Sequence, residues 1–431
     1  MIPFAAGARS RLLPVSVPMR YFAAAVAFQV LAWAMLLAAS EPLSAFRAGL
    51  GPVFAALHAV TLGVLAVAAV GASLQMLPVA TRQPVRSIAA AKLAWWLLVP
   101  GLLLFTGGAA GYRPQLMAAG AAAAFIALAI YGWLLFENLR GARGMPAIRA
   151  YGWAALACLA LALALGVALV AHYEFGIALD RSAFAAAHLV LASYGFLGLL
   201  ALGFSSFLLP MFALAPAPSE RGAAIALIAC VCAIALALAA IVLGRDDLLA
   251  FAAAAGFGAA LFHVIMIERS LRARLRPPLG SAFLLVRVAW LCLLASLALG
   301  AALALGVATE RAQVLFGVLL VPGWLLTFLL AVLQRIVPFL ASVHAGGAGR
   351  SPARVSTMTP QRTLDAHRVL HLCALAALVV GVASASDWLT RLGAAIGLAA
   401  AIAYGVFFVA VMLRLRGAQQ GGSPDVLQPT H

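Results

Sequence analysis

The stretch from His58 to Pro78, HAVTLGVLAVAAVGASLQMLP, decides the architecture of this chain. It is apolar over a length that crosses a hydrocarbon core of ~30 Å, and it carries a histidine near one end. Gly63, Gly71 and Pro78 follow one another at intervals of eight and seven residues. Two later stretches repeat these intervals, with Gly195, Gly203 and Pro210 in one and Gly323, Ala331 and Pro338 in the other. The spacing predicts a threefold internal repeat, each copy about a third of the chain.

The composition indicates a membrane protein. Of the 431 residues, 66% are hydrophobic and 9% are charged, whereas soluble chains carry about 25% charged residues. The formal net charge of +16 raises the possibility of nucleic acid as a partner. The basic residues, however, lie in short loops between apolar stretches, which excludes that interpretation and makes the lipid bilayer the main partner. All five cysteines fall inside apolar stretches, so no disulfide framework is expected.

The apolar stretches predict twelve membrane spans. Backbone groups find no water in lipid, so uniformly apolar spans of this length are helices rather than barrel strands. The spans are predicted at about 20–40, 50–77, 88–110, 115–137, 150–171, 183–209, 222–243, 248–268, 281–306, 312–337, 364–384 and 389–413. The predicted fold is an all-α integral membrane protein with twelve transmembrane helices. These form three four-helix pseudo-repeats in a single polytopic domain of residues 1–431, at about 20–137, 150–268 and 281–413.

The placement of arginine predicts the orientation. With both termini on the cytoplasmic side, the cytoplasmic loops carry most of the arginines, and the opposite loops carry one each: Arg47, Arg113, Arg181, Arg245, Arg311 and Arg391. The N-terminal arginines precede the first span without a clear cleavage site, which predicts an uncleaved first helix. The only long loop, 338–363, is expected to be a flexible cytoplasmic linker, and 417–431 a disordered tail.

Two histidines are candidate cofactor ligands. His58 and His188 lie at similar depths near the outer ends of the first two repeated spans, and polar residues at depth in lipid usually face the bundle interior. A neutral imidazole there either ligates a metal or haem iron or bonds to a neighbouring polar group. His58 precedes Gly63 by five residues and His188 precedes Gly195 by seven, an offset of about 200° around a helix. The two imidazoles therefore either face each other across one haem or turn toward the tenth span as two half-sites.

The other polar residues give weaker signals. His367 and His371 have the i, i+4 spacing of metal ligands, but they begin a span on the cytoplasmic side, where solvated side chains are common. No metal site is predicted there. His263 and Glu268 are expected at the membrane interface. No phosphate-binding loop, nucleophile elbow, zincin signature or CxxC pair occurs in the sequence, so no catalytic residue is predicted.

These features together resemble subunit I of the haem–copper oxidases. The resemblance rests on twelve helices in three repeats, a histidine near the outer end of the second span, and the sixth-span phrase HLVLASYGFLGLLALG from His188 to Gly203, with LLPM following. The chain is also similar to haem- and copper-containing membrane proteins associated with nitric oxide response in denitrifying bacteria. The resemblance implies a bacterial inner membrane, a redox partner protein and a b-type haem. His58 matches the low-spin haem ligand, and His188 lies on the helix that carries a copper ligand in true oxidases.

The chain also departs from that family. The paired histidines of the seventh span and the two haem-ligating histidines of the tenth are absent, and Ala192 stands where a tyrosine would follow His188. The resemblance therefore implies no copper and no oxygen-reducing centre. It implies electron transfer or a role related to nitric oxide or metal, and leaves open whether the protein is an enzyme. The alternatives are a cofactor-free structural or assembly subunit and a secondary transporter, although transporters usually show two halves of six spans.

Overall fold

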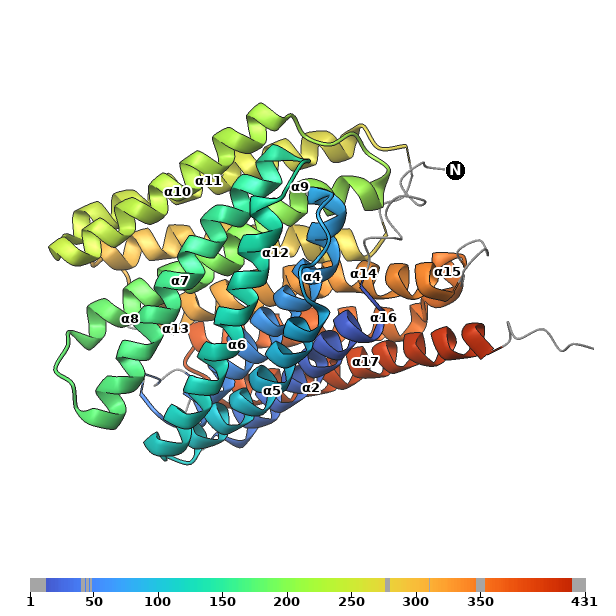
Figure 1. Ribbon diagram of the computed structural model, residues 1–431. Coiled ribbons are helices and arrows are strands. Elements are labelled where there is room, and N and C mark those ends of the chain that lie inside the picture. The colour runs from blue at the N-terminus through green and yellow to red at the C-terminus, as the bar shows by residue number, and fades with distance from the viewer. Residues whose placement is uncertain are drawn as a thin grey trace, which may run out of the picture.

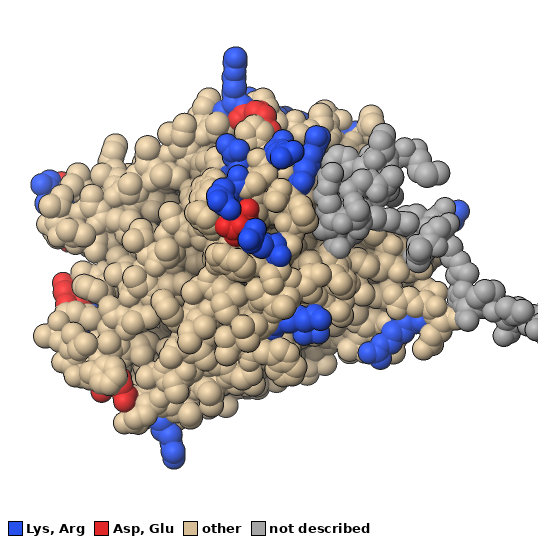
Figure 2. Space-filling model, in the orientation of Figure 1, with Lys and Arg blue, Asp and Glu red and all other residues tan. Residues whose placement is uncertain are grey.

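The computed structural model describes residues 13–39, 43, 46, 49–275, 280–309, 311–345 and 353–420. Within these residues the secondary structure is helical, and twelve helices are long and apolar enough to cross a membrane. The prediction of an all-α membrane protein with twelve spans is confirmed. Most of the face seen in Figure 2 carries neither basic nor acidic residues, as expected for helices whose sides meet lipid.

The spans follow one another along the chain in the predicted order. They are α2 (Ser16–Ala38), α3–η2–α4 (Pro52–His58, Ala59–Ala66, Val67–Thr81), α5 (Ile88–Ala110), α6 (Pro114–Arg140), α7 (Pro146–Phe175), α8–η3–α9 (Arg181–Leu189, Val190–Gly198, Leu199–Ala213), α10 (Glu220–Leu243), α11 (Asp246–Arg272), α12 (Ala282–Ala304), α13–η4–α14 (Arg311–Val318, Leu319–Leu326, Thr327–Ala345), α16 (Gln361–Ala383) and α17 (Asp387–Gln420). We number them spans 1 to 12. A short helix, α15 (Val355–Met358), lies between spans 10 and 11.

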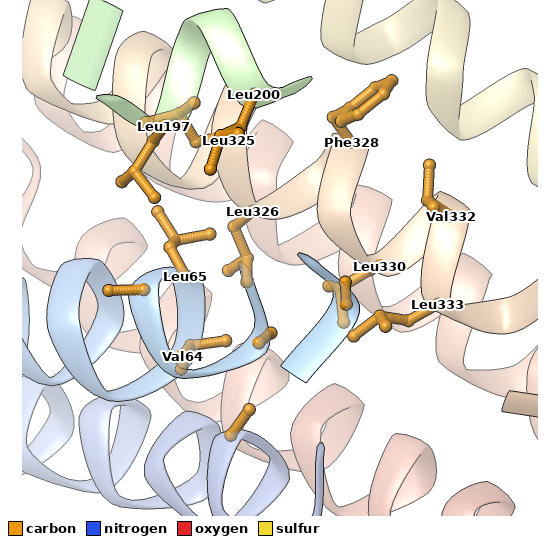
Figure 3. Close-up of a cluster of buried hydrophobic side chains, with 14 of the residues drawn as sticks. Val64, Leu65, Leu197, Leu200, Leu325, Leu326, Phe328, Leu330, Val332 and Leu333 are labelled. Atoms are coloured by element: carbon orange, nitrogen blue, oxygen red, sulfur yellow. The ribbon is translucent and has the colours of Figure 1, made fainter. Parts of the chain in front are cut away.

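Spans 2, 6 and 10 form the interior of the bundle. Their most apolar 18-residue windows are 61%, 83% and 67% buried, against 17% for span 5. The η4 segment packs against both η2 and η3. Figure 3 shows the core there, with Leu65, Leu197 and Leu325 contributed by the three spans. The start of α2 and the end of α17 lie at the same end of the bundle (Figure 1). As labels of position only, we name it the inner end and the opposite end the outer end.

Each interior span changes from α- to π-helical hydrogen bonding at the same place in the repeated pattern. The segments η2, η3 and η4 contain Gly63, Gly195 and Gly323, and each segment ends three residues after its glycine. A π-helical segment inserts an extra residue into the helical turn and often marks a functional site. The backbone thus takes the same local form at three places that the glycine spacing relates.

The repeated prolines do not end their helices. Pro78 and Pro210 are each followed by three more helical residues, and the helices end at Arg82 and Leu214, which have positive φ angles of 57° and 52°. In span 10 the helix continues for seven residues after Pro338. A proline removes only its own bond to the residue four positions earlier, so the turn after it can remain helical.

The linker predicted at 338–363 is therefore wrong in its bounds. Its first eight residues belong to α14, which ends at Ala345, and its last part contains α15 and the start of α16. Residues 346–352 lie outside the described part of the chain. The tail predicted at 417–431 begins as helix, because α17 continues to Gln420, and residues 421–431 also lie outside the described part.

Candidate functional site

His58 lies at the junction of α3 and η2. Its Nδ1 is 3.1 Å from the carbonyl oxygen of Phe54, one turn earlier in the same helix. Its ring packs against the rings of Phe54 and Phe105, with centroid distances of 4.1 and 5.3 Å. A carbonyl oxygen only accepts, so this bond places the proton of a neutral His58 on Nδ1 and leaves the lone pair on Nε2.

His188 lies near the end of α8, just before η3. Its Nδ1 is 2.9 Å from the carbonyl oxygen of Ala162 on α7, so the neutral ring is again protonated on Nδ1 with a lone pair on Nε2. The ring approaches α7 closely at Gly166, where an added methyl carbon would lie 3.2 Å from His188 Cε1. Glycine at this position lets the ring lie against the helix backbone.

The structure brings the two predicted ligands into one region of the bundle. Span 5 connects their surroundings, because α7 bonds to His188 and also supplies Val170 and Tyr173 to the apolar cluster that contains Phe54. Both rings are half-buried and lie within two residues of a π-helical segment.

The donor chemistry of this pair fits haem iron. Histidines that ligate a metal usually donate the N–H of the other ring nitrogen to a carbonyl or carboxylate, which fixes the ring and leaves the ligating nitrogen free. His58 and His188 both have this arrangement. It also satisfies a histidine that carries no metal, because each bond already accounts for the N–H of a neutral ring.

Two cavities lie in the bundle. One, of about 330 Å³, is lined mainly by spans 1, 2 and 10, including Leu57 and Pro322. The other, of about 420 Å³, is lined by spans 6 to 10, including Tyr194 and Trp324. Neither lining includes His58 or His188, but the first cavity is lined by Leu57 and Leu189, their direct neighbours in the chain, and the second also by Leu189.

His263 lies inside the bundle rather than on its surface. It is fully buried, and its Nε2 is 2.8 Å from the hydroxyl oxygen of Ser205 in span 6. It lies on the same face of α11 as Ala259 and Ile267, which are also buried. Glu268, one turn later, has a partly exposed side chain and pairs with Arg287 at 3.0 Å.

The expectation of solvated histidines at the start of span 11 is wrong. His367 and His371 are 0% and 1% exposed. They continue the buried face of α16 that contains Leu364, Ala374 and Leu378, at helical spacing. That spacing was the available sequence signal, but it is weak where alanine and leucine surround a helix on every side.

Known proteins add no family to this description. No family model matches the chain, and no curated protein matches it. Among the described residues, no group of three or more His, Cys, Asp or Glu side chains is placed to hold a metal ion. The resemblance to oxidase subunit I therefore remains a prediction based on the motifs of spans 2 and 6.

Proposed function

We propose that this chain is a haem-binding membrane protein in which His58 and His188 ligate one b-type haem. The observation that supports the proposal is a pair of half-buried imidazoles whose surroundings share span 5, each with Nδ1 fixed by a backbone carbonyl. An iron held by two imidazoles has no open coordination position, so such a haem supplies one-electron transfer rather than chemistry on a bound ligand. The proposed function is electron transfer within the membrane, with a redox protein as partner.

The residues around the pair have supporting roles. The carbonyls of Phe54 and Ala162 hold the two rings in one tautomer and orientation. The rings of Phe54 and Phe105 pack against the His58 ring and give it apolar neighbours. Gly166 leaves the space that the His188 ring occupies.

We also propose that the fold consists of three four-helix repeats. The three matching π-helical segments support this arrangement. Two hydrogen bonds support it further, because Ser73–Tyr131 at 3.0 Å and Ser205–His263 at 2.8 Å join spans 2 and 4 and spans 6 and 8. Each residue of the second pair lies 132 residues after its counterpart in the first, the same offset that separates Pro78 from Pro210.

The proposed location is a bacterial inner membrane with both termini in the cytoplasm. The arginine-rich connections lie on the side of the chain ends in this topology, which follows the positive-inside rule. The shared inner end of α2 and α17 is consistent with it.

The test is a reduced-minus-oxidised visible spectrum and a pyridine haemochrome assay on the full chain purified in detergent from a haem-replete host. We expect a stoichiometric low-spin b-type signal that His58→Ala and His188→Ala each abolish. The matched control is His172→Ala, since His172 is also near the outer end and bonds through Nδ1 to a carbonyl, that of Ile177 at 2.8 Å. Full haem content in both variants would show that these histidines are not the ligands.

A cofactor-free structural subunit is the second candidate. It is favoured by the two carbonyl bonds, which satisfy the ring N–H groups without any metal. This candidate predicts no haem in the purified protein and unchanged behaviour when both histidines are replaced.

A further inference from the structure

A second histidine pair lies near the inner end of the bundle. His367 and His371 stack on one another, with ring centroids 5.6 Å apart and planes at 28°. Tyr404 of α17 packs edge-on against His367, with centroids 4.9 Å apart. All three side chains are at most 1% exposed.

Hydrogen bonds fix the tautomers of both rings. His367 Nδ1 is 3.0 Å from the carbonyl oxygen of Ala400, so it donates its proton there. The hydroxyl of Thr327 donates to the carbonyl oxygen of Pro322 at 2.8 Å. Its oxygen therefore accepts from His371 Nε2, which is 2.7 Å away.

Three polar atoms remain without partners. They are Nε2 of His367, Nδ1 of His371 and the hydroxyl oxygen of Tyr404, and each is buried. With these tautomers, neither free nitrogen carries a proton. Each can give its lone pair to a cation, but the two nitrogens cannot hydrogen-bond to each other. Buried polar atoms are normally paired, so this cluster calls for an occupant that accepts two nitrogen lone pairs.

We propose that His367, His371 and Tyr404 bind a late first-row divalent metal ion, with Zn²⁺ as the fitting example. Two histidines one helical turn apart on the same helix face form a known zinc-binding arrangement. The carbonyl of Ala400 and the hydroxyl of Thr327 hold the other ring nitrogens, as outer partners of metal-ligating histidines do. Imidazole ligands without a carboxylate select against Mg²⁺ and Ca²⁺.

Tyr404 completes a three-ligand set and compensates charge. A dication held only by neutral ligands is costly in a membrane. Loss of the Tyr404 phenol proton to solvent on binding leaves a phenolate–metal bond and lowers the net charge of the site by one. His367 lies within two turns of Gln361, where α16 begins. This proposal does not depend on haem binding by His58 and His188.

The test is zinc binding by the full chain in detergent. The protein is stripped with a chelator, incubated with ZnCl₂, separated from free metal by gel filtration, and analysed for zinc by elemental mass spectrometry. We expect about one zinc per chain in the wild type and none in His367→Ala or His371→Ala. Thr327→Val, which removes the outer partner of His371 and leaves both histidines in place, should weaken zinc binding about 10–100-fold.

Matched controls separate this site from unspecific imidazole binding. His263→Ala removes a fully buried histidine that also has an unpaired ring nitrogen but no second histidine beside it. It should retain zinc. If the alanine variants fail to fold, Tyr404→Phe keeps the ring and removes only the oxygen, and zinc should then raise the Tm of the wild type more than that of the variant.

Two results would overturn the proposal. The first is a wild-type chain that neither retains zinc nor gains thermal stability from it, as expected if a water molecule fills the cluster. The second is equal zinc retention in the wild type, His367→Ala and His371→Ala. Haem is measured separately, as iron, so the zinc result can be interpreted even if the haem proposal fails.

Discussion

Spans 2 and 6 differ from span 10 because each carries a histidine before its π-helical segment. All three have a π-helical segment at the same place. In spans 2 and 6, His58 and His188 precede that segment at the outer end; in span 10 the corresponding positions are Val318 and Phe316. Span 10 instead contacts a histidine of another span after its segment, where Thr327 bonds to His371. A shared backbone plan thus supports two different histidine pairs at opposite ends of the bundle.

The two pairs also differ in construction. His58 and His188 come from spans far apart in the sequence, are half-buried, and both keep a free Nε2. His367 and His371 come from one helix, are fully buried, and keep a free Nε2 and a free Nδ1. Ligands on separate helices suit a group that lies between helices, such as a haem. Ligands one turn apart on one helix suit a single ion.

The largest expected effect is a reciprocal loss of metals. The double variant His58→Ala/His188→Ala should lose haem iron and keep zinc, while His367→Ala/His371→Ala should lose zinc and keep haem iron. The reason is that the pairs use different ligands on different helices. Iron and zinc are measured in the same sample by elemental analysis, with Tm as the check on folding. Loss of both metals in either folded variant would contradict two independent sites.

A second effect concerns packing where the spans differ. A methyl carbon added at Gly71 or Gly203 would lie 2.7 Å from Tyr21 Cβ or 2.9 Å from Tyr151 Cβ. Span 10 already has Ala331 at the corresponding position. Gly203→Ala should therefore destabilise the protein by about 1–3 kcal/mol, because the helix backbones must move apart. The measurement is an unfolding titration in mixed micelles.

The control for this packing prediction is Gly258→Ala. An added methyl carbon there meets no atom within 4 Å, so the substitution should be neutral or stabilising by up to about 1 kcal/mol through helix propensity. Equal destabilisation at the two positions would show that close contact between spans 5 and 6 is not the cause.

The sequence predicts the spans well because each span is recognised from the hydrophobicity of its whole length, which a single substitution hardly alters. It predicts helix ends less well: α14 continues beyond Pro338, and its extension is held by tertiary contacts such as the bond between Ser342 and the carbonyl of Ala353. His58 and His188 could be singled out because the repeat relates their positions. His367 could not, because alanine and leucine cover every face of these helices and hide which face is buried.

The smallest effect tests the hydrogen bonds that spans 2 and 6 share and span 10 lacks. Ser73 accepts from Tyr131, and Ser205 accepts from His263, because each serine hydroxyl donates to a carbonyl in its own helix. By the repeat spacing the corresponding residue of span 10 is Leu333.

Ser73→Ala and Ser205→Ala should each cost about 0.6 kcal/mol, and at most about 1.7, because hydrogen bonds between membrane helices contribute little beyond what alternative partners offer. Both are measured by the same unfolding titration. Ser384→Ala is the control, since its hydroxyl bonds only to the carbonyl of Val380 at an exposed position. A cost at Ser205 no greater than at Ser384 would mean that the bond to His263 adds no stability. Spans 2 and 6 would then share the geometry of this hydrogen bond without gaining stability from it.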